Sequence, residues 1–129
     1  VTDTLKLLDD NHIPCALATS TRKEVVTKEL TNLGVIDYFD KLICVDMVER
    51  SKPAPDIFLK ACEELGVAPD KAFAVEDSYN GVRAAHSAGM KVVMIPDLVQ
   101  PDAEMREKAL IIFENMDGLK EYIMRLVTT

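Results

Sequence analysis

Short apolar segments alternate along this chain with stretches of helical spacing, and this alternation limits the fold more than any other feature. The segments that predict strands cover residues 13–19, 42–45, 72–75 and 91–95. The stretches that predict helices between them cover residues 21–33, 56–65 and 79–88, each followed by a glycine. Because parallel strands need helical crossovers, we predict a Rossmann-like, three-layer α/β/α fold around a parallel sheet.

Further helical patterns flank this unit. Leu5 and Leu8 mark a first helix, and weaker signals predict helices over residues 102–110 and 116–127 with a short edge strand at 111–113. In the helix over residues 21–33, Thr21 and Glu24 have capping-box spacing. The apolar residues of that helix expected to face the core are Val25, Val26, Leu30 and Leu33.

The composition suits one soluble domain that binds a small molecule. The chain has 129 residues with a formal net charge of −7, which opposes a nucleic-acid or anionic-membrane partner because both need a basic surface. It contains neither a membrane-spanning apolar run nor a signal-peptide pattern at its start, so we expect a cytoplasmic protein. Cys15, Cys44 and Cys62 are widely spaced in apolar surroundings, which favours buried free thiols.

Ligands of open α/β sheets bind at the carboxyl ends of the strands, so the residues that follow each strand matter most. After the first strand come Thr19, Ser20 and Thr21, whose hydroxyls and backbone N–H groups at a helix start suit an oxyanion. Helix capping by Ser20 or Thr21 is the alternative.

The next two strands are followed by charged residues. Lys52 stands before a proline in the loop after the second strand, which biases its backbone toward an extended conformation. We therefore expect its ammonium to have a defined direction. A solvated surface lysine is the alternative. Glu76 and Asp77 follow the third strand and suit Mg²⁺, although Asp77 or Ser78 could instead cap the next helix. Hydroxyl, lysine and carboxylates around one crevice match the needs of phosphoryl transfer.

These residues also form recognisable motifs. Residues 51–58, SKPAPDIF, and residues 75–78, VEDS, together with Gly81, resemble the haloacid dehalogenase superfamily, in particular its beta-phosphoglucomutase and phosphoglycolate phosphatase-like branch. The resemblance covers residue 1 to about residue 97.

The resemblance assigns a role to each candidate residue. Thr19, with the Ser20 amide, would bind the transferring phosphate, and Lys52 would bridge that phosphate and the nucleophilic aspartate. Asp77 would bind Mg²⁺, with Glu76 as a second or water-mediated ligand. The implied reaction is Mg²⁺-dependent hydrolysis of small phosphate monoesters, such as sugar phosphates, through an aspartyl-phosphate.

Two parts of the family pattern have no match among residues 1–129. The family's first motif, Asp-x-Asp, supplies the attacking aspartate at the end of a central strand, and a helical cap domain normally follows it; neither is found here. We therefore interpret residues 1–129 as a partial core domain that is inactive alone. We expect an upstream segment, a second chain or a swapped protomer to supply the missing strand between the first and third strands, or else those two strands to pair directly.

Two other functions stay open. The chain could be an inert fragment or interaction module, and a phospho-receiver domain is a remote alternative, since receivers carry their acidic pair early and their lysine late. His12 and His86 lie away from the strand ends and are expected to have surface or half-buried structural roles. The resemblance implies either a phosphatase or a phosphomutase.

Overall fold

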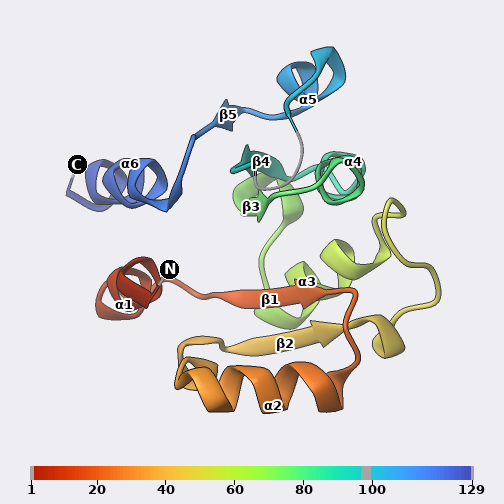
Figure 1. Cartoon of the computed structure of the whole chain (residues 1–129), viewed down its shortest axis with the longest axis vertical. Coiled ribbons are helices and arrows are strands. Elements are labelled where there is room, and N and C mark those ends of the chain that lie inside the picture. The colour runs from red at the N-terminus through yellow and green to blue at the C-terminus, as the bar shows by residue number, and fades with distance from the viewer. Residues whose placement is uncertain (1, 97–99, 129) are drawn as a thin grey trace.

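The computed structural model describes residues 2–96 and 100–128, which form two parallel sheets with helices around them (Figure 1). The strands are β1 (Ala16–Thr19), β2 (Lys41–Cys44), β3 (Phe73–Glu76), β4 (Lys91–Met94) and β5 (Ile111–Ile112). The strand β1 pairs with β2, while β4 lies between β3 and β5, and every pairing is parallel. The predicted α/β fold with parallel strands is confirmed.

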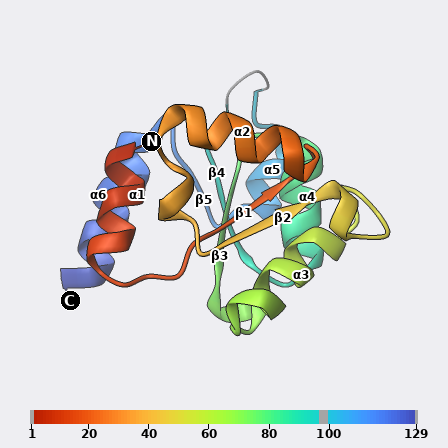
Figure 2. The same cartoon turned by 90° about the horizontal axis from the view of Figure 1, so that it is seen from below.

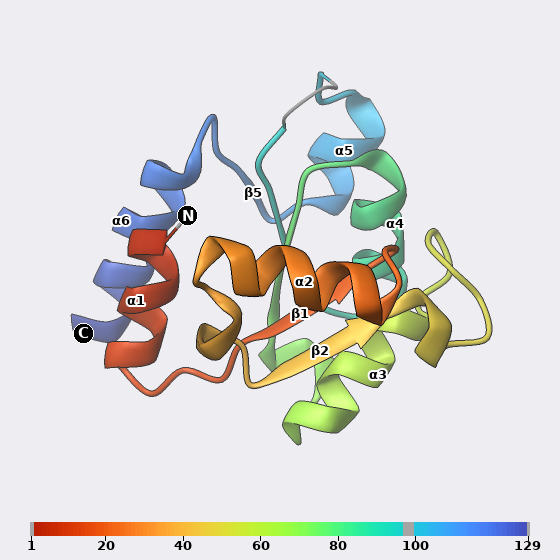
Figure 3. The ribbon, with the colours of Figure 1, turned by 60° about the horizontal axis from the view of Figure 1, so that its bottom comes forward.

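Helices cover the strands. They are α1 (Thr2–Asp10), α2 (Lys23–Leu33), α3 (Asp56–Leu65), α4 (Tyr79–Ser87), α5 (Ala103–Lys108) and α6 (Met116–Thr128), with short 3-10 turns at Ile36–Tyr38, Val45–Met47 and Pro69–Lys71. Helices α2 and α3 lie on opposite sides of the β1–β2 pair (Figure 2). The first and last helices, α1 and α6, lie side by side at one end of the molecule (Figure 3).

The two sheets are not joined by strand pairing. Within residues 2–96 and 100–128, β1 pairs only with β2, and β3 pairs only with β4. The alternative in which the first and third strands pair directly is therefore wrong. On β3, Phe73 and Val75 remain 42% and 46% exposed, which differs from a strand buried on both faces. An open edge therefore lies between β1 and β3, where the sequence predicted a missing strand.

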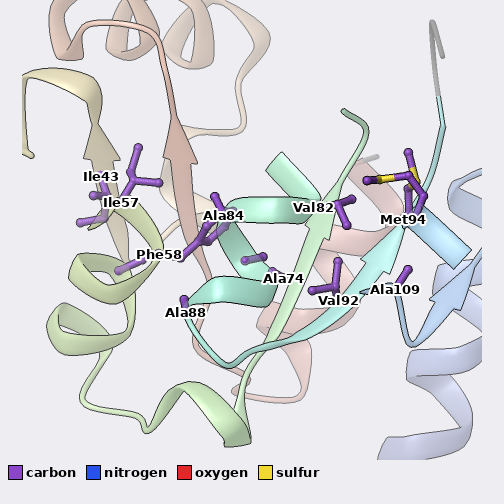
Figure 4. Packing of buried hydrophobic residues seen from close by; sticks show 13 residues of the cluster. Ile43, Ile57, Phe58, Ala74, Val82, Ala84, Ala88, Val92, Met94 and Ala109 are labelled. Carbon is purple, nitrogen blue, oxygen red and sulfur yellow. The ribbon is translucent and has the colours of Figure 1, made fainter. Parts of the chain in front are cut away.

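One hydrophobic core nevertheless spans both sheets (Figure 4). Its fully buried members include Ile43 of β2, Ile57 of α3, Ala84 of α4 and Val92 of β4. The small side chains of α4 allow it to approach α3 closely, and contact between these two helices connects the halves. This shared core fixes the position of β1 relative to β3, although no backbone hydrogen bonds join these two strands.

Some local predictions were wrong. The strand predicted over residues 13–19 begins only at Ala16. Cys15, just before it, is joined to Asp40 by two hydrogen bonds: its amide donates to the Asp40 side chain at 2.8 Å, and its carbonyl accepts from the Asp40 amide at 2.7 Å. The N-cap of α2 is Arg22, which makes no side-chain cap, so the capping box predicted from Thr21 and Glu24 is absent.

The predicted inner face of α2 was also only partly right. Val26 is 4% exposed, whereas Val25 and Leu33 are 47% and 74% exposed. Leu30 is half-buried. The buried stripe of the helix is narrower than its apolar residues suggest, and its main contacts in the described part of the chain are with β2 and the turn at Ile36–Tyr38.

The three cysteines are free, as predicted. Cys44 and Cys62 are buried and Cys15 is half-buried. Burial, with a smaller contribution from Asp40, raises the pKa of Cys15 to about 11. A thiol in this state is a poor nucleophile at neutral pH, which is consistent with a packing role.

Among the described residues, no helix is long and apolar enough to cross a membrane.

An ion-pair cluster joins α4 to α5. Arg83 donates twice to the Glu104 carboxylate, at 2.8 Å each, and Lys108 donates to it at 2.8 Å. The hydrogen bonds from Arg83, then from Lys108, lower the pKa of Glu104 from 4.5 to about 2. The cluster therefore stabilises the fold above about pH 4.5, and this contribution is lost as the pH falls through about 2.

A Glu104→Gln variant is expected to unfold at lower urea than the parent chain at pH 7. The difference between the two midpoints should shrink as the pH approaches 2, because the parent carboxylate then becomes protonated as well. Urea titrations followed by circular dichroism at both pH values measure this. A pH-independent difference would show that the Glu104 charge is not the source of the stabilisation.

Candidate functional site at the strand ends

The Lys52 ammonium connects the ends of two strands that do not pair. Its Nζ donates to Oε2 of Glu76 at 2.7 Å and to the backbone carbonyl of Ala18 at 3.5 Å. Ala18 lies near the end of β1 and Glu76 ends β3. The side chains of Lys52 and Glu76 are only 13% and 9% exposed. Lys52 is thus aimed inward, and the alternative of a solvated surface lysine is wrong.

The loop and helix around Lys52 hold it in this position. The ring of Phe58 on α3 lies 5.1 Å from Nζ, a favourable cation–π distance. Arg50 and Asp56 form two hydrogen bonds, of 3.0 and 3.2 Å, that fasten the start of the loop to the start of α3. Asp56 and Phe58 lie in the SKPAPDIF motif and Arg50 just before it, yet their roles were not predicted from the sequence.

Thr19 ends β1 and shapes the turn that follows. Its Oγ1 accepts a hydrogen bond from the Thr21 amide at 3.1 Å. The N-cap of α2 is Arg22, and it makes no side-chain cap. The alternative in which Ser20 or Thr21 caps this helix is therefore wrong. The Thr19 hydroxyl still has its own proton to donate, and Ser20 is exposed beside it. This geometry is compatible with oxyanion binding.

Glu76 and Asp77 have different surroundings. Glu76 is bound by Lys52, whereas Asp77 is exposed just beyond β3. Ser78 is the N-cap of α4, and its Oγ accepts from the Gly81 amide at 3.1 Å. Capping by Ser78 is therefore confirmed, while Asp77 has a different position and remains available for another role.

The carboxylates provide a small donor set for a metal. In the part of the chain that the structure describes, no three His, Cys, Asp or Glu side chains gather closely enough to hold an ion. Mg²⁺ often takes only one or two carboxylates and completes its shell with water and phosphate oxygens, so Asp77 with Glu76 fits that ion only as part of such a shell. Glu76 could join it through its second oxygen, Oε1, or by sharing the oxygen that faces Lys52.

The structure therefore brings the predicted residues to one edge. Lys52 and Glu76 are in direct contact, Thr19 follows the carbonyl that Lys52 reaches, and Asp77 follows Glu76. The histidines lie elsewhere. His12 is exposed before the amino end of β1, and His86 is exposed near the end of α4, in agreement with a surface role.

A parallel α/β fold with charged side chains at the carboxyl ends of its strands places this chain in the Rossmann-like class. Residues 1–95 match the family model described as haloacid dehalogenase-like hydrolase. Since this match covers well over half of the chain, the chain belongs to the haloacid dehalogenase-like family, as the motifs predicted.

Three relatives illustrate the similarity. A phosphorylated carbohydrates phosphatase from Thermotoga maritima is 40% identical over 91 residues, which cover 70% of this chain and 42% of that protein. The structure of CbbY from Rhodobacter sphaeroides in complex with phosphate aligns with a TM-score of 0.82 and 31% identity, over 92% of this chain and 53% of that one. Beta-phosphoglucomutase from Clostridium difficile gives a TM-score of 0.82 and 27% identity, over 98% and 54% of the two chains.

The chain therefore spans about half the length of the relatives that it matches. The similarity supports the expectation of a beta-phosphoglucomutase-like branch. It also shows that known relatives of this chain include phosphatases of phosphorylated carbohydrates.

Proposed function

We propose that this chain provides the phosphate-binding and metal-binding side of a Mg²⁺-dependent hydrolase that acts on small phosphate monoesters, such as sugar phosphates. The observation that carries the proposal is the position of Lys52. Its ammonium is shielded and held between the ends of β1 and β3, where the sequence also places hydroxyl and carboxylate groups. Relatives named as phosphatases support the same chemistry.

Each residue has a distinct task in this proposal. The Thr19 hydroxyl and the Ser20 amide hold the phosphate oxygens, and Lys52 balances their charge. Asp77, with Glu76 as a second or water-mediated ligand, would hold Mg²⁺, which supplies electrostatic stabilisation of the transferring phosphate. Phosphate binding near Lys52 would compete with Glu76 for the ammonium, because both carry negative charge.

The proposal assigns residues 1–129 to a partial core domain whose nucleophile is supplied by another segment. The open edges of β1 and β3 can accept one parallel strand, and an aspartate at its carboxyl end would lie near Lys52. That aspartate would attack phosphorus and form an aspartyl-phosphate. An upstream segment or a swapped protomer could provide the strand, and a small phosphorylated metabolite in the cytoplasm would be the substrate.

A catalytically inert fragment or interaction module is the second candidate, because residues 1–129 contain no match to the Asp-x-Asp motif. A complementation assay separates the two. The chain is mixed with a synthetic peptide of an apolar strand that ends in Asp-x-Asp, and hydrolysis of p-nitrophenyl phosphate is measured with Mg²⁺ or with excess chelator.

We expect turnover only when the chain, the peptide and Mg²⁺ are all present, and none with a peptide carrying Asn in place of the first Asp. Binding of the peptide must be measured in parallel by fluorescence anisotropy. A peptide that binds and yet produces no turnover would favour the inert module.

A further inference from the structure

Gly81 lies directly against the Glu76 carboxylate. It is buried in the first turn of α4, five residues after Glu76. A Cβ atom built on Gly81 would stand 1.8 Å from Oε1 of Glu76 and 2.2 Å from its carboxyl carbon. Both distances are far inside van der Waals contact. The space that glycine leaves free is thus the space that this carboxylate occupies.

The backbone does not explain a glycine at this position. Gly34, Gly66 and Gly89 have φ angles of 73°, 71° and 85°, which favour glycine for conformational reasons. Gly81 has no positive φ and lies in a regular helix, where alanine is ordinarily preferred by about 1 kcal/mol. What Gly81 uniquely permits is the close approach of Glu76.

The position of Glu76 in turn determines where the Lys52 ammonium lies. With one carboxylate oxygen against Gly81, the other accepts from Lys52 at 2.7 Å. The flexible end of Glu76 is the part that would have to move if residue 81 had a side chain. Such a move would separate the two charged groups without requiring the backbone of β3 or α4 to shift.

We propose that Gly81 is a positioning residue of this site: its missing side chain seats the Glu76 carboxylate, and the seated carboxylate holds Lys52 at the ends of β1 and β3. The importance of Lys52 for phosphate rests on the function proposed above. The effect of Gly81 on the positions of Glu76 and Lys52 does not depend on that function, and it can be tested without a catalytic assay.

The test measures how fast each lysine of the folded chain is acetylated by a trace amount of acetic anhydride, with peptide mass spectrometry as the readout. In the parent chain, Lys52 should be protected by its ion pair and its low exposure. In a Gly81→Ala variant, Lys52 should react about tenfold faster, the order expected for loss of a charge-assisted hydrogen bond. Lys60, which pairs with Glu64 on the exposed side of α3, should be unchanged.

Gly118 offers a matched control. It is the third residue of α6, as Gly81 is of α4, and its amide donates to the side chain of Asn115. A Cβ atom there would stand 2.7 Å from the ring of Phe113, away from Lys52. Gly118→Ala should therefore leave the reactivity of Lys52 as it is in the parent. Equal acceleration of Lys52 by both variants would mean general loosening and would overturn the proposal.

A double-mutant cycle tests whether Gly81 acts through Glu76. Glu76→Ala should itself accelerate acetylation of Lys52, and adding Gly81→Ala should then change the rate by less than about twofold. The proposal is overturned if Gly81→Ala has no effect in the parent, or a full effect without the Glu76 carboxylate. If the cycle succeeds and the complementation assay shows no turnover, the positioning role stands and the proposed hydrolase activity fails.

Discussion

Replacing Lys52 by alanine is expected to lower hydrolysis of p-nitrophenyl phosphate by the complemented chain about 100- to 1,000-fold, the usual effect of removing a group that stabilises transition-state charge. The variant loses the ammonium at the strand ends and leaves the Glu76 carboxylate, 9% exposed, without its partner. That uncompensated negative charge would also repel a phosphate. Steady-state rates at several substrate concentrations measure the loss.

Lys60→Ala is the control for this substitution. Lys60 also forms an ion pair, at 3.3 Å with Glu64 one helical turn further along α3, but these two side chains are 34% and 35% exposed. Its removal should leave the rate unchanged within about twofold. Because Lys52→Ala removes a shielded ion pair, circular dichroism must show that the variant is folded. A folded Lys52→Ala variant with the parent rate would contradict the assigned role.

Ile57→Ala is expected to destabilise the fold by about 2–5 kcal/mol, the range for deleting a large buried side chain. Ile57 is 1% exposed and packs in the core cluster that connects both sheets. A loss of this size is a large part of the 5–15 kcal/mol by which domains are normally stable. Urea unfolding followed by circular dichroism gives the free energy of unfolding.

Another apolar position on the same helix, two residues further along, provides the control. Leu59 is 43% exposed, so Leu59→Ala should cost no more than about 1 kcal/mol, with nearly the same change in helix propensity. Equal losses for Ile57→Ala and Leu59→Ala would show that α3 does not bury the face described here.

The elements with local start and stop signals could be predicted from the sequence. Helix α3 runs over Asp56–Leu65 as predicted, because two prolines precede it and Gly66 ends it with a φ of 71°. Exposure was harder to predict. Val25 and Leu33 have helical spacing, yet whether a neighbour covers them depends on the width of the sheet, which sequence periodicity does not contain.

The candidate site divides in the same way. Lys52 and the carboxylates could be identified because each follows a predicted strand, and the order of such strands predicts which edge they share. Three contacts could not be predicted: the hydrogen bond from Lys52 to the Ala18 carbonyl, the Phe58 ring beside the ammonium, and the close approach of Glu76 to Gly81. They depend on distances between segments that are far apart in the sequence, and only the folded chain sets those distances.

The central claim is that phosphate binds at the ends of β1 and β3. A titration of the ¹⁵N-labelled chain with inorganic phosphate, with and without Mg²⁺, tests it directly by nuclear magnetic resonance. We predict that the amide shifts concentrate at Thr19, Ser20, Lys52, Glu76 and Asp77, that Mg²⁺ enlarges them, and that Lys52→Ala removes them. Unchanged amides at these five residues, with or without Mg²⁺, would contradict the claim.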